Sequence, residues 1–216
     1  TVSSVEETAS SAVDENEAAA AQLLNDLTGS YQELWPVILA DEYKQTWLDD
    51  CTALVGEENA EAAFEKLSSM VTSDVYGEDA VEAYANGGGA YFCGFTNSLA
   101  ILTFDGETST ISGTDKDGNV LFSHTYHYIG MEPVHGLYEF ESDDADSGEF
   151  TYFFLAPDTS AETYHIEFRY GSDAEALSQY DAGEYAYWVA SGISTDCDQT
   201  MIDNCIELFC TENLAG

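Results

Sequence analysis

The sequence predicts a mainly β protein, an antiparallel barrel with helices before and after it. Between about residues 90 and 170, the spacing of apolar residues changes from helical to alternating, which is typical of half-buried strands. Short turn sequences separate the alternating stretches, and two of them, Asp105-Gly106 and Asp117-Gly118, favour tight hairpins. Consecutive strands joined by tight turns form a meander, and closing a meander into a barrel removes its exposed edges.

The chain of 216 residues is long enough for one domain with a proper core. Residues 1–22 are rich in Ser, Ala and Glu and hold no aromatic residue, so we expect an acidic tether or the start of a helix there. We expect residues 23–216 to form the single domain.

Helices are expected on both sides of the barrel. Pro36 suits the first turn of a helix that continues to Leu48, and a second helical spacing runs from Ala60 to Met70. A final helix is expected near residues 201–209, after a helical or irregular stretch that follows Gly171. The strands are expected at 90–95, 98–104, 107–113, 119–129, 136–142, 148–155 and 163–170.

The charge of the chain favours cations as partners. Lys and Arg number 4 against 42 Asp and Glu, which gives a formal net charge of -38. Such a surface repels phosphate backbones and anionic lipid heads, so we expect no nucleic-acid binding and no membrane insertion. The alternative is that the charge only keeps the protein soluble at high salt or outside the cell. Disorder is not expected, because 44% of the residues are hydrophobic.

The five cysteines permit two disulfides and one remaining thiol, and the sequence leaves the pairing open. The cysteines and an initial Thr in place of Met favour a secreted protein. We expect no enzyme, because the sequence contains neither a GxSxG nucleophile motif nor a GxxxxGK[ST] phosphate-binding loop.

The stretch from Thr163 to Gly171 is the clearest strand, and its polar face is the first candidate for a site. Alternation places His165 and Glu167 together on one face, where an imidazole nitrogen and a carboxylate oxygen suit an ion of the zinc class. The alternative is a polar outer face on which Arg169 pairs with Glu167. His124 and His127 are three residues apart in a strand, so they point to opposite faces.

The order of segments resembles the ZinT (YodA) family of zinc-trafficking proteins of the bacterial envelope. Residues 27–36 resemble the family's opening Trp-x-Gly-x-Trp-Gln-Ser-Val-Tyr-Pro segment, with Gly29, Gln32 and Pro36 kept. Residues 137–141 resemble its Arg-Tyr-Leu-Phe-Glu strand, and the later turn, strand and helix follow in the family's order to about residue 190. The resemblance implies a calycin-like (lipocalin-like) barrel and zinc binding.

The family binds metal through an Asp-His-Ile-Ile-Ala-Pro strand and a following His-Phe-His-Ile-Phe-x-Gly strand. Counting back from Pro157 places Phe153 at the first of these histidines. Counting back from Gly171 places His165 and Glu167 at the paired histidines, while an alternative alignment places Thr163 and His165 there. The resemblance therefore implies an altered site for zinc or another divalent cation, with Glu149 or His127 as a third ligand.

The resemblance also implies a mechanism of capture, in which a water-exposed barrel mouth holds the ion for a metal-uptake transporter component. We expect an extracellular or cell-envelope location, with a lipid anchor upstream of residue 1. The alternative is a barrel without metal that binds a small apolar ligand or a protein partner. That ligand would contact the aromatic interior at Phe153 and a patch formed by Tyr185, Tyr187 and Trp188.

Overall fold

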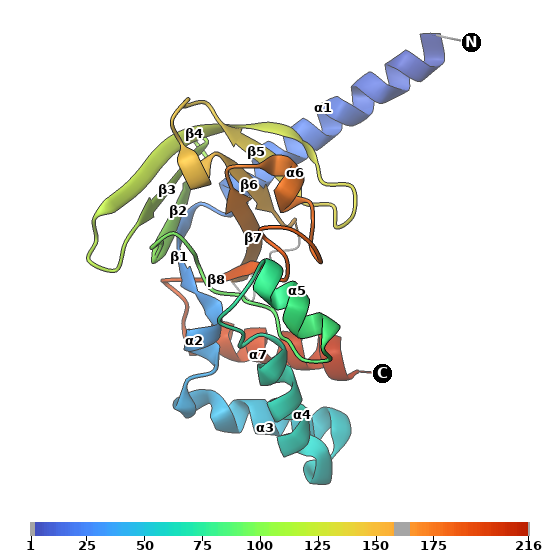
Figure 1. Ribbon diagram of the computed structural model, residues 1–216, viewed down its shortest axis with the longest axis vertical. Coiled ribbons are helices and arrows are strands. Elements are labelled where there is room, and N and C mark those ends of the chain that lie inside the picture. The colour runs from blue at the N-terminus through green and yellow to red at the C-terminus, as the bar shows by residue number, and fades with distance from the viewer. Residues whose placement is uncertain (1–2, 158–164, 216) are drawn as a thin grey trace.

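The chain folds into a closed antiparallel β-barrel with helices at both ends of the sequence (Figure 1). The computed structural model describes residues 3–157 and 165–215. Each strand pairs with the next along the chain, and the last strand closes on the first, so the predicted meander and barrel are confirmed. The strands are β1 (Gly29–Glu33), β2 (Ile101–Asp105), β3 (Thr110–Thr114), β4 (Val120–Met131), β5 (Tyr138–Ser142), β6 (Tyr152–Leu155), β7 (His165–Gly171) and β8 (Ala190–Ser194).

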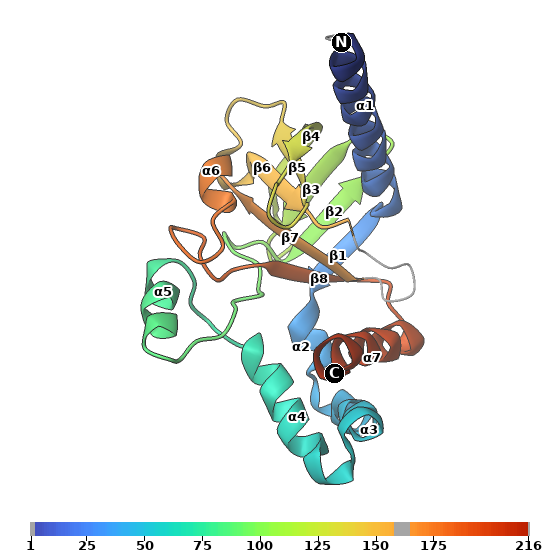
Figure 2. The same cartoon turned by 90° about the vertical axis from the view of Figure 1, so that its right-hand side faces the viewer.

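The helices form two groups around the barrel. In both Figure 1 and Figure 2, α1 projects away from the barrel, while α2, α3, α4 and α7 gather at the opposite end, on the side of β8. The α-helices are α1 (Ser3–Asp26), α2 (Leu34–Ile38), α3 (Lys44–Val55), α4 (Glu57–Met70), α5 (Glu78–Ala85), α6 (Ala174–Leu177) and α7 (Gln199–Leu214). Two short 3-10 turns, η1 (Asp41–Tyr43) and η2 (Gly148–Phe150), precede α3 and β6. None of the described helices has a stretch long and apolar enough to cross a bilayer.

Both hairpins that the sequence predicts are present, but of the two turn glycines only Gly118 has a positive φ, because the positive φ of the first turn falls on Ser109. Asp105-Gly106 lies between β2 and β3, and Asp117-Gly118 lies between β3 and β4. Gly118 has a φ of 82°, a conformation that glycine adopts without steric cost. The Asp115 carboxylate accepts backbone N–H groups of Asp117 (2.9 Å) and Asn119 (2.8 Å), which fixes the turn.

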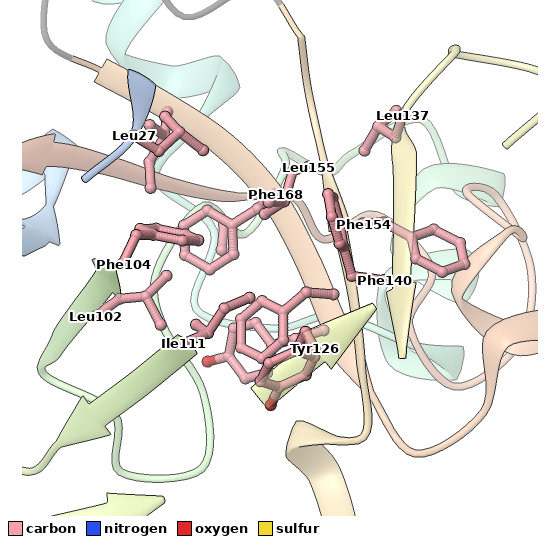
Figure 3. Packing of buried hydrophobic residues seen from close by; sticks show 14 of the residues in the cluster. Leu27, Leu102, Phe104, Ile111, Tyr126, Leu137, Phe140, Phe154, Leu155 and Phe168 are labelled. Carbon is pink, nitrogen blue, oxygen red and sulfur yellow. The ribbon is translucent and has the colours of Figure 1, made fainter. Parts of the chain in front are cut away.

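The barrel interior is a packed aromatic and aliphatic core. Alternate residues of each strand point inward, and Figure 3 shows Phe104, Ile111, Tyr126 and Phe168 converging there. Phe104, Ile111 and Phe168 are at most 1% exposed. Full burial of one such side chain stabilises the fold by roughly 1.5–3 kcal/mol. An eight-stranded barrel is just wide enough for side chains to fill, and this one is filled by its own residues.

A second core lies outside the barrel, between the outer face of β8 and the helices α2, α3, α4 and α7. Ile193 of β8 packs there with residues of α2, α3, α4 and α7. The indole nitrogen of Trp47 in α3 donates to the carbonyl oxygen of Ile38 at 2.7 Å, which joins α3 to α2. The buried members of this second core are Leu34, Trp35, Ile38, Trp47, Cys51, Ala60, Ala63, Leu67, Cys93, Ile193, Ile202, Cys205, Ile206 and Cys210.

Several elements differ from the sequence prediction. Strands β1 and β8, which close the barrel, were not among the expected strands, and β8 lies in the stretch after Gly171 that was expected to be helical or irregular. Residues 90–95 form no strand and make only isolated bridges through Phe92, to Thr72 and Trp188. The helix expected from Pro36 is interrupted by η1, so that α2 and α3 are separate. Residues 1–22 were expected to be an acidic tether or the start of a helix, and helix α1 already begins at Ser3. Helix α5 was not predicted.

Candidate metal and ligand site

Strand β7 has two chemically different faces, as its alternation predicts. Ile166, Phe168 and Tyr170 point into the barrel and belong to its core. His165, Glu167 and Arg169 therefore point outward, because successive side chains of a strand alternate between faces. On the neighbouring strand β8, Ile193 is the partner of His165 and Ser191 is the partner of Glu167. The outer face of β7 and β8 thus forms one wall of the second core.

His165 is buried between β7 and α7. Its side chain is 5% exposed, and the centre of its ring lies 5.7 Å from the ring centre of Phe209 in α7. The expected water-exposed position at the barrel mouth is therefore wrong for this residue. The physical reason is that His165 faces outward from β7, where the C-terminal helix α7 covers it and excludes water.

Glu167 is half-buried and lines a pocket between the barrel and the helices. The pocket has a volume of about 290 Å³, and its aromatic walls are Trp35, Trp47, Tyr91 and Phe209. A second pocket of about 450 Å³ is also lined by Tyr91 and Glu167, and it extends to His135 and Tyr180. Glu167 is consequently the carboxylate that the two pockets share.

The other two predicted ligands lie elsewhere in contacts of their own. His127 is exposed on β4, and its Nδ1 atom lies 2.8 Å from Oδ1 of Asp143. The Glu149 carboxylate accepts the hydroxyl groups of Ser172 and Tyr185, each at 3.1 Å. Across residues 3–157 and 165–215, no three His, Cys, Asp or Glu side chains are grouped so that they could hold a metal ion. The donor pair His165 and Glu167 suits zinc chemically, and the third ligand stays a prediction.

The strand register separates the positions that the resemblance brings into one site. Phe153 of β6 pairs with Tyr170 of β7, so its side chain points into the barrel and is fully buried. His165 and Glu167 point out of the barrel, on the other side of the same sheet. A histidine at position 153 would therefore not meet these two side chains. Thr163, which the alternative alignment uses, lies outside the described residues.

The four aromatic residues predicted to bind a ligand pack against other residues of the protein. Phe153, Tyr185 and Trp188 are each at most 3% exposed and belong to the barrel core. The indole nitrogen of Trp188 donates to the carbonyl oxygen of Gly94 at 2.9 Å. Tyr187 is half-buried and stacks on Tyr84, with ring centres 3.7 Å apart. The pocket-lining aromatics described above are instead residues that the sequence prediction did not select.

Arg169 is fully buried and stabilises the segment between α6 and β8. Its guanidinium group donates to the backbone carbonyls of Leu177, Gln179 and Tyr185. The guanidinium carbon also lies 4.2 Å from the ring centre of Tyr180, which is a cation–π contact. Burial lowers the pKa of Arg169. Because Tyr180 lines the larger pocket, Arg169 fixes part of the wall of that pocket.

The thiol groups near Glu167 have raised pKa values because they are buried. Burial raises the pKa of the Cys93 thiol to about 12, and the nearby Glu167 carboxylate adds to this rise. Burial likewise raises the pKa of Cys205 to about 12. The buried indole nitrogen of Trp35 has no hydrogen-bond partner among the described residues. The smaller pocket therefore combines aromatic walls, the carboxylates of Glu167 and Glu212, and a buried N–H donor.

Comparison with known proteins connects this geometry to one fold. No protein-family model matches the sequence, and no curated protein matches it. The Zn(II)-bound ZinT-like domain of Streptococcus pneumoniae AdcA matches 83% of this chain and 87% of its own chain, at 15% identity and a TM-score of 0.51. Zn(II)-bound AdcA from the same organism matches 88% of this chain and 34% of its own, at 14% identity and a TM-score of 0.46. The eight-stranded barrel with its flanking helices therefore has the ZinT-like calycin fold.

Proposed function

We propose that the chain binds a divalent metal ion, with zinc as the first candidate, at an altered ZinT-type site whose protein donors are His165 and Glu167. One observation carries the proposal: the two side chains share the outer face of β7, two residues apart, with Glu167 at the edge of a pocket. Imidazole nitrogen and carboxylate oxygen are both zinc donors. The fold that the chain shares with a Zn(II)-bound domain supports the same proposal.

The surface charge and the pockets support a capture mechanism rather than catalysis. A net charge of -38 raises the concentration of cations near the protein. Glu167 lines both pockets, which supports a role for its carboxylate in binding a cation there. Two protein donors leave further coordination positions to water, so the site binds more weakly than one with three protein ligands. An extracellular or envelope location and delivery to a metal-uptake transporter component belong to the same proposal.

The test is a zinc titration of protein purified without chelator, after measurement of its bound metal. We expect about one zinc per chain and a Kd tighter than ~10 µM, because a scavenger has to bind well below that concentration. His165→Ala and Glu167→Gln should each weaken binding about tenfold or more, since each removes one of two donors. The titration is run at 0.15 M salt, which screens the diffuse attraction of the acidic surface.

His124→Ala is the matched control for these variants, because His124 is a histidine of β4 that contacts Asp144 and is not among the predicted ligands. Its zinc affinity should equal that of the wild type. A wild-type Kd weaker than ~10 µM overturns the proposal, and equal affinity in wild type and His165→Ala moves the site away from β7.

A second candidate function is the binding of a small apolar ligand in the 290 Å³ pocket. The specific observation is the combination of Trp35, Trp47 and Phe209 as walls with the unpartnered indole N–H of Trp35, which suits a ligand with a hydrogen-bond acceptor. The barrel interior favours this candidate less, since its inward-facing aromatics are closely packed. The ligand would therefore lie outside the barrel, beneath α7.

A neutral fluorescent probe such as N-phenyl-1-naphthylamine tests the second candidate without repulsion from the acidic surface. Val189→Trp should reduce probe fluorescence at least threefold, because Val189 lines both pockets and a larger side chain fills them. Val120→Trp is the matched control, as Val120 is 70% exposed at the start of β4. Equal fluorescence in the two variants would contradict ligand binding in this pocket.

A further inference from the structure

Two cysteines that are far apart in the sequence lie in contact in the second core. Cys51 lies on α3 and Cys210 lies on α7, 159 residues later in the chain. Their sulfur atoms are 3.9 Å apart, and both side chains are fully buried. Both residues belong to the apolar cluster that joins α3 to α7, so the contact lies within packed structure rather than in a loop.

The two sulfur atoms lie in contact without being bonded. A disulfide bond is about 2.05 Å long, so the two sulfurs need to approach by about 1.9 Å. Rotation of the two side chains changes the position of each sulfur without displacing either helix backbone. The sequence leaves fifteen ways to form two bridges from five cysteines, and the packing of α3 on α7 selects one pair.

We propose that Cys51 and Cys210 form an intramolecular disulfide that joins α3 to α7. The two thiols together give up two protons and two electrons, and a bond forms between the two Sγ atoms. The oxidant is another disulfide, either a small-molecule disulfide or a thiol–disulfide exchange protein, which is reduced to two thiols. The inference does not depend on metal binding.

The burial of the pair indicates when the bond forms. Burial raises the pKa of both thiols, and the contact with Cys51 together with the charge of Asp50 raises that of Cys210 further. The thiolate is the form that attacks a disulfide, and it is scarce at neutral pH when the pKa is raised. Oxidation is therefore slow once α3 and α7 have packed, and we expect the bond to form while the chain folds.

The cross-link fixes two walls of the 290 Å³ pocket. Trp47 lies one helical turn before Cys51 on α3, and Phe209 directly precedes Cys210 on α7. Both aromatic side chains line the pocket. The same helix α7 covers His165 through Phe209. A bond between Cys51 and Cys210 thus holds the helix that covers the candidate site.

Peptide mapping of the wild-type protein tests the proposal directly. The chain is refolded with a mixture of oxidised and reduced glutathione, unfolded without reductant, and treated with iodoacetamide. We expect alkylated Cys93, and a linked pair of peptides that contains Cys51 and Cys210 and separates on reduction. Alkylation of all five cysteines, or a bond from Cys51 to any other cysteine, overturns the proposal.

Thermal unfolding provides a second readout that does not depend on mapping. Reduction should lower the Tm of the oxidised wild type by roughly 4–16 °C, because a native disulfide stabilises the folded state of a chain of this size. Cys51→Ser should lose this response to reductant, whereas the control Cys93→Ser should keep it, since Cys93 is also buried but lies outside α3 and α7. A wild-type Tm that does not respond to reduction contradicts the proposal even if Cys51→Ser fails to fold.

Discussion

The two cores of the molecule, inside and outside the barrel, differ in composition and in what they leave room for. Inside the barrel, the inward-facing aromatics of neighbouring strands pack on one another, with 5.4 Å between the ring centres of Phe153 and Tyr170. Outside it, the apolar residues of β8 and the helices surround cysteines, a buried histidine and a pocket that reaches a carboxylate. Strand β7 belongs to both regions, because its inward-facing residues pack inside the barrel and its outward-facing residues lie against the second core.

The difference shows where a barrel of this size can carry a function. Eight strands enclose only enough space for their own side chains, so the interior contributes stability. The helices leave the smaller pocket at Glu167 between them and the outer wall of β7. The helices added to the barrel therefore create the candidate site, while the barrel supplies the strand that carries its polar residues.

The largest effect is expected from a cavity inside the barrel. Phe168→Ala should lower the free energy of unfolding by about 3–5 kcal/mol, because it removes a fully buried ring that the closed barrel cannot collapse around. Urea unfolding followed by tryptophan fluorescence measures this loss. Val120→Ala, at an exposed position of β4, should change the free energy by less than about 0.5 kcal/mol. A loss below about 1 kcal/mol for Phe168→Ala would contradict a tightly packed interior.

The next effect concerns the outer face of the same strand. Arg169→Leu should destabilise the protein by about 2–3 kcal/mol, because the carbonyls of Leu177 and Tyr185 lose their buried donor. The measurement is again urea unfolding, with the exposed Lys116→Leu as the matched control. Equal stability of Arg169→Leu and Lys116→Leu would contradict this role, because it would mean that water replaces the guanidinium group without cost.

The barrel was predictable from the sequence where strands alternate large apolar and polar residues. Strands β4 and β7 have such alternation and were found, and Asp117-Gly118 gave the hairpin between β3 and β4. Strand β8 reads Ala-Ser-Gly-Ile-Ser, and its small residues give almost no periodic signal. Its Gly192 lies against Ile166, where an added Cβ would come within 3.1 Å of that side chain. Close packing, which the sequence alone does not reveal, determines this strand.

The candidate site was predictable only on the side that β7 provides. Alternation indicated that His165 and Glu167 share a face, and the structure places them on one. The opposite walls come from Trp35 and Trp47 on the helices α2 and α3 and from Phe209 on the distant helix α7. A helical spacing marks such residues as core and does not indicate which strand they face. The burial of His165 under α7 depends on the same long-range packing.

The smallest effect tests the electrostatics of the outer region through Tyr180. Burial raises the pKa of its phenol from 10 to about 12, although the charge of Arg169 opposes this rise. The folded pKa is above the unfolded one, so this contribution to stability is present below pH 10 and is lost as the pH rises through 12. Tyr180→Phe should therefore lose less stability than the wild type between pH 8 and pH 11, by about 1 kcal/mol after allowance for solvent screening. Urea unfolding at the two pH values measures this, and parallel losses would mean that the hydroxyl group is solvated.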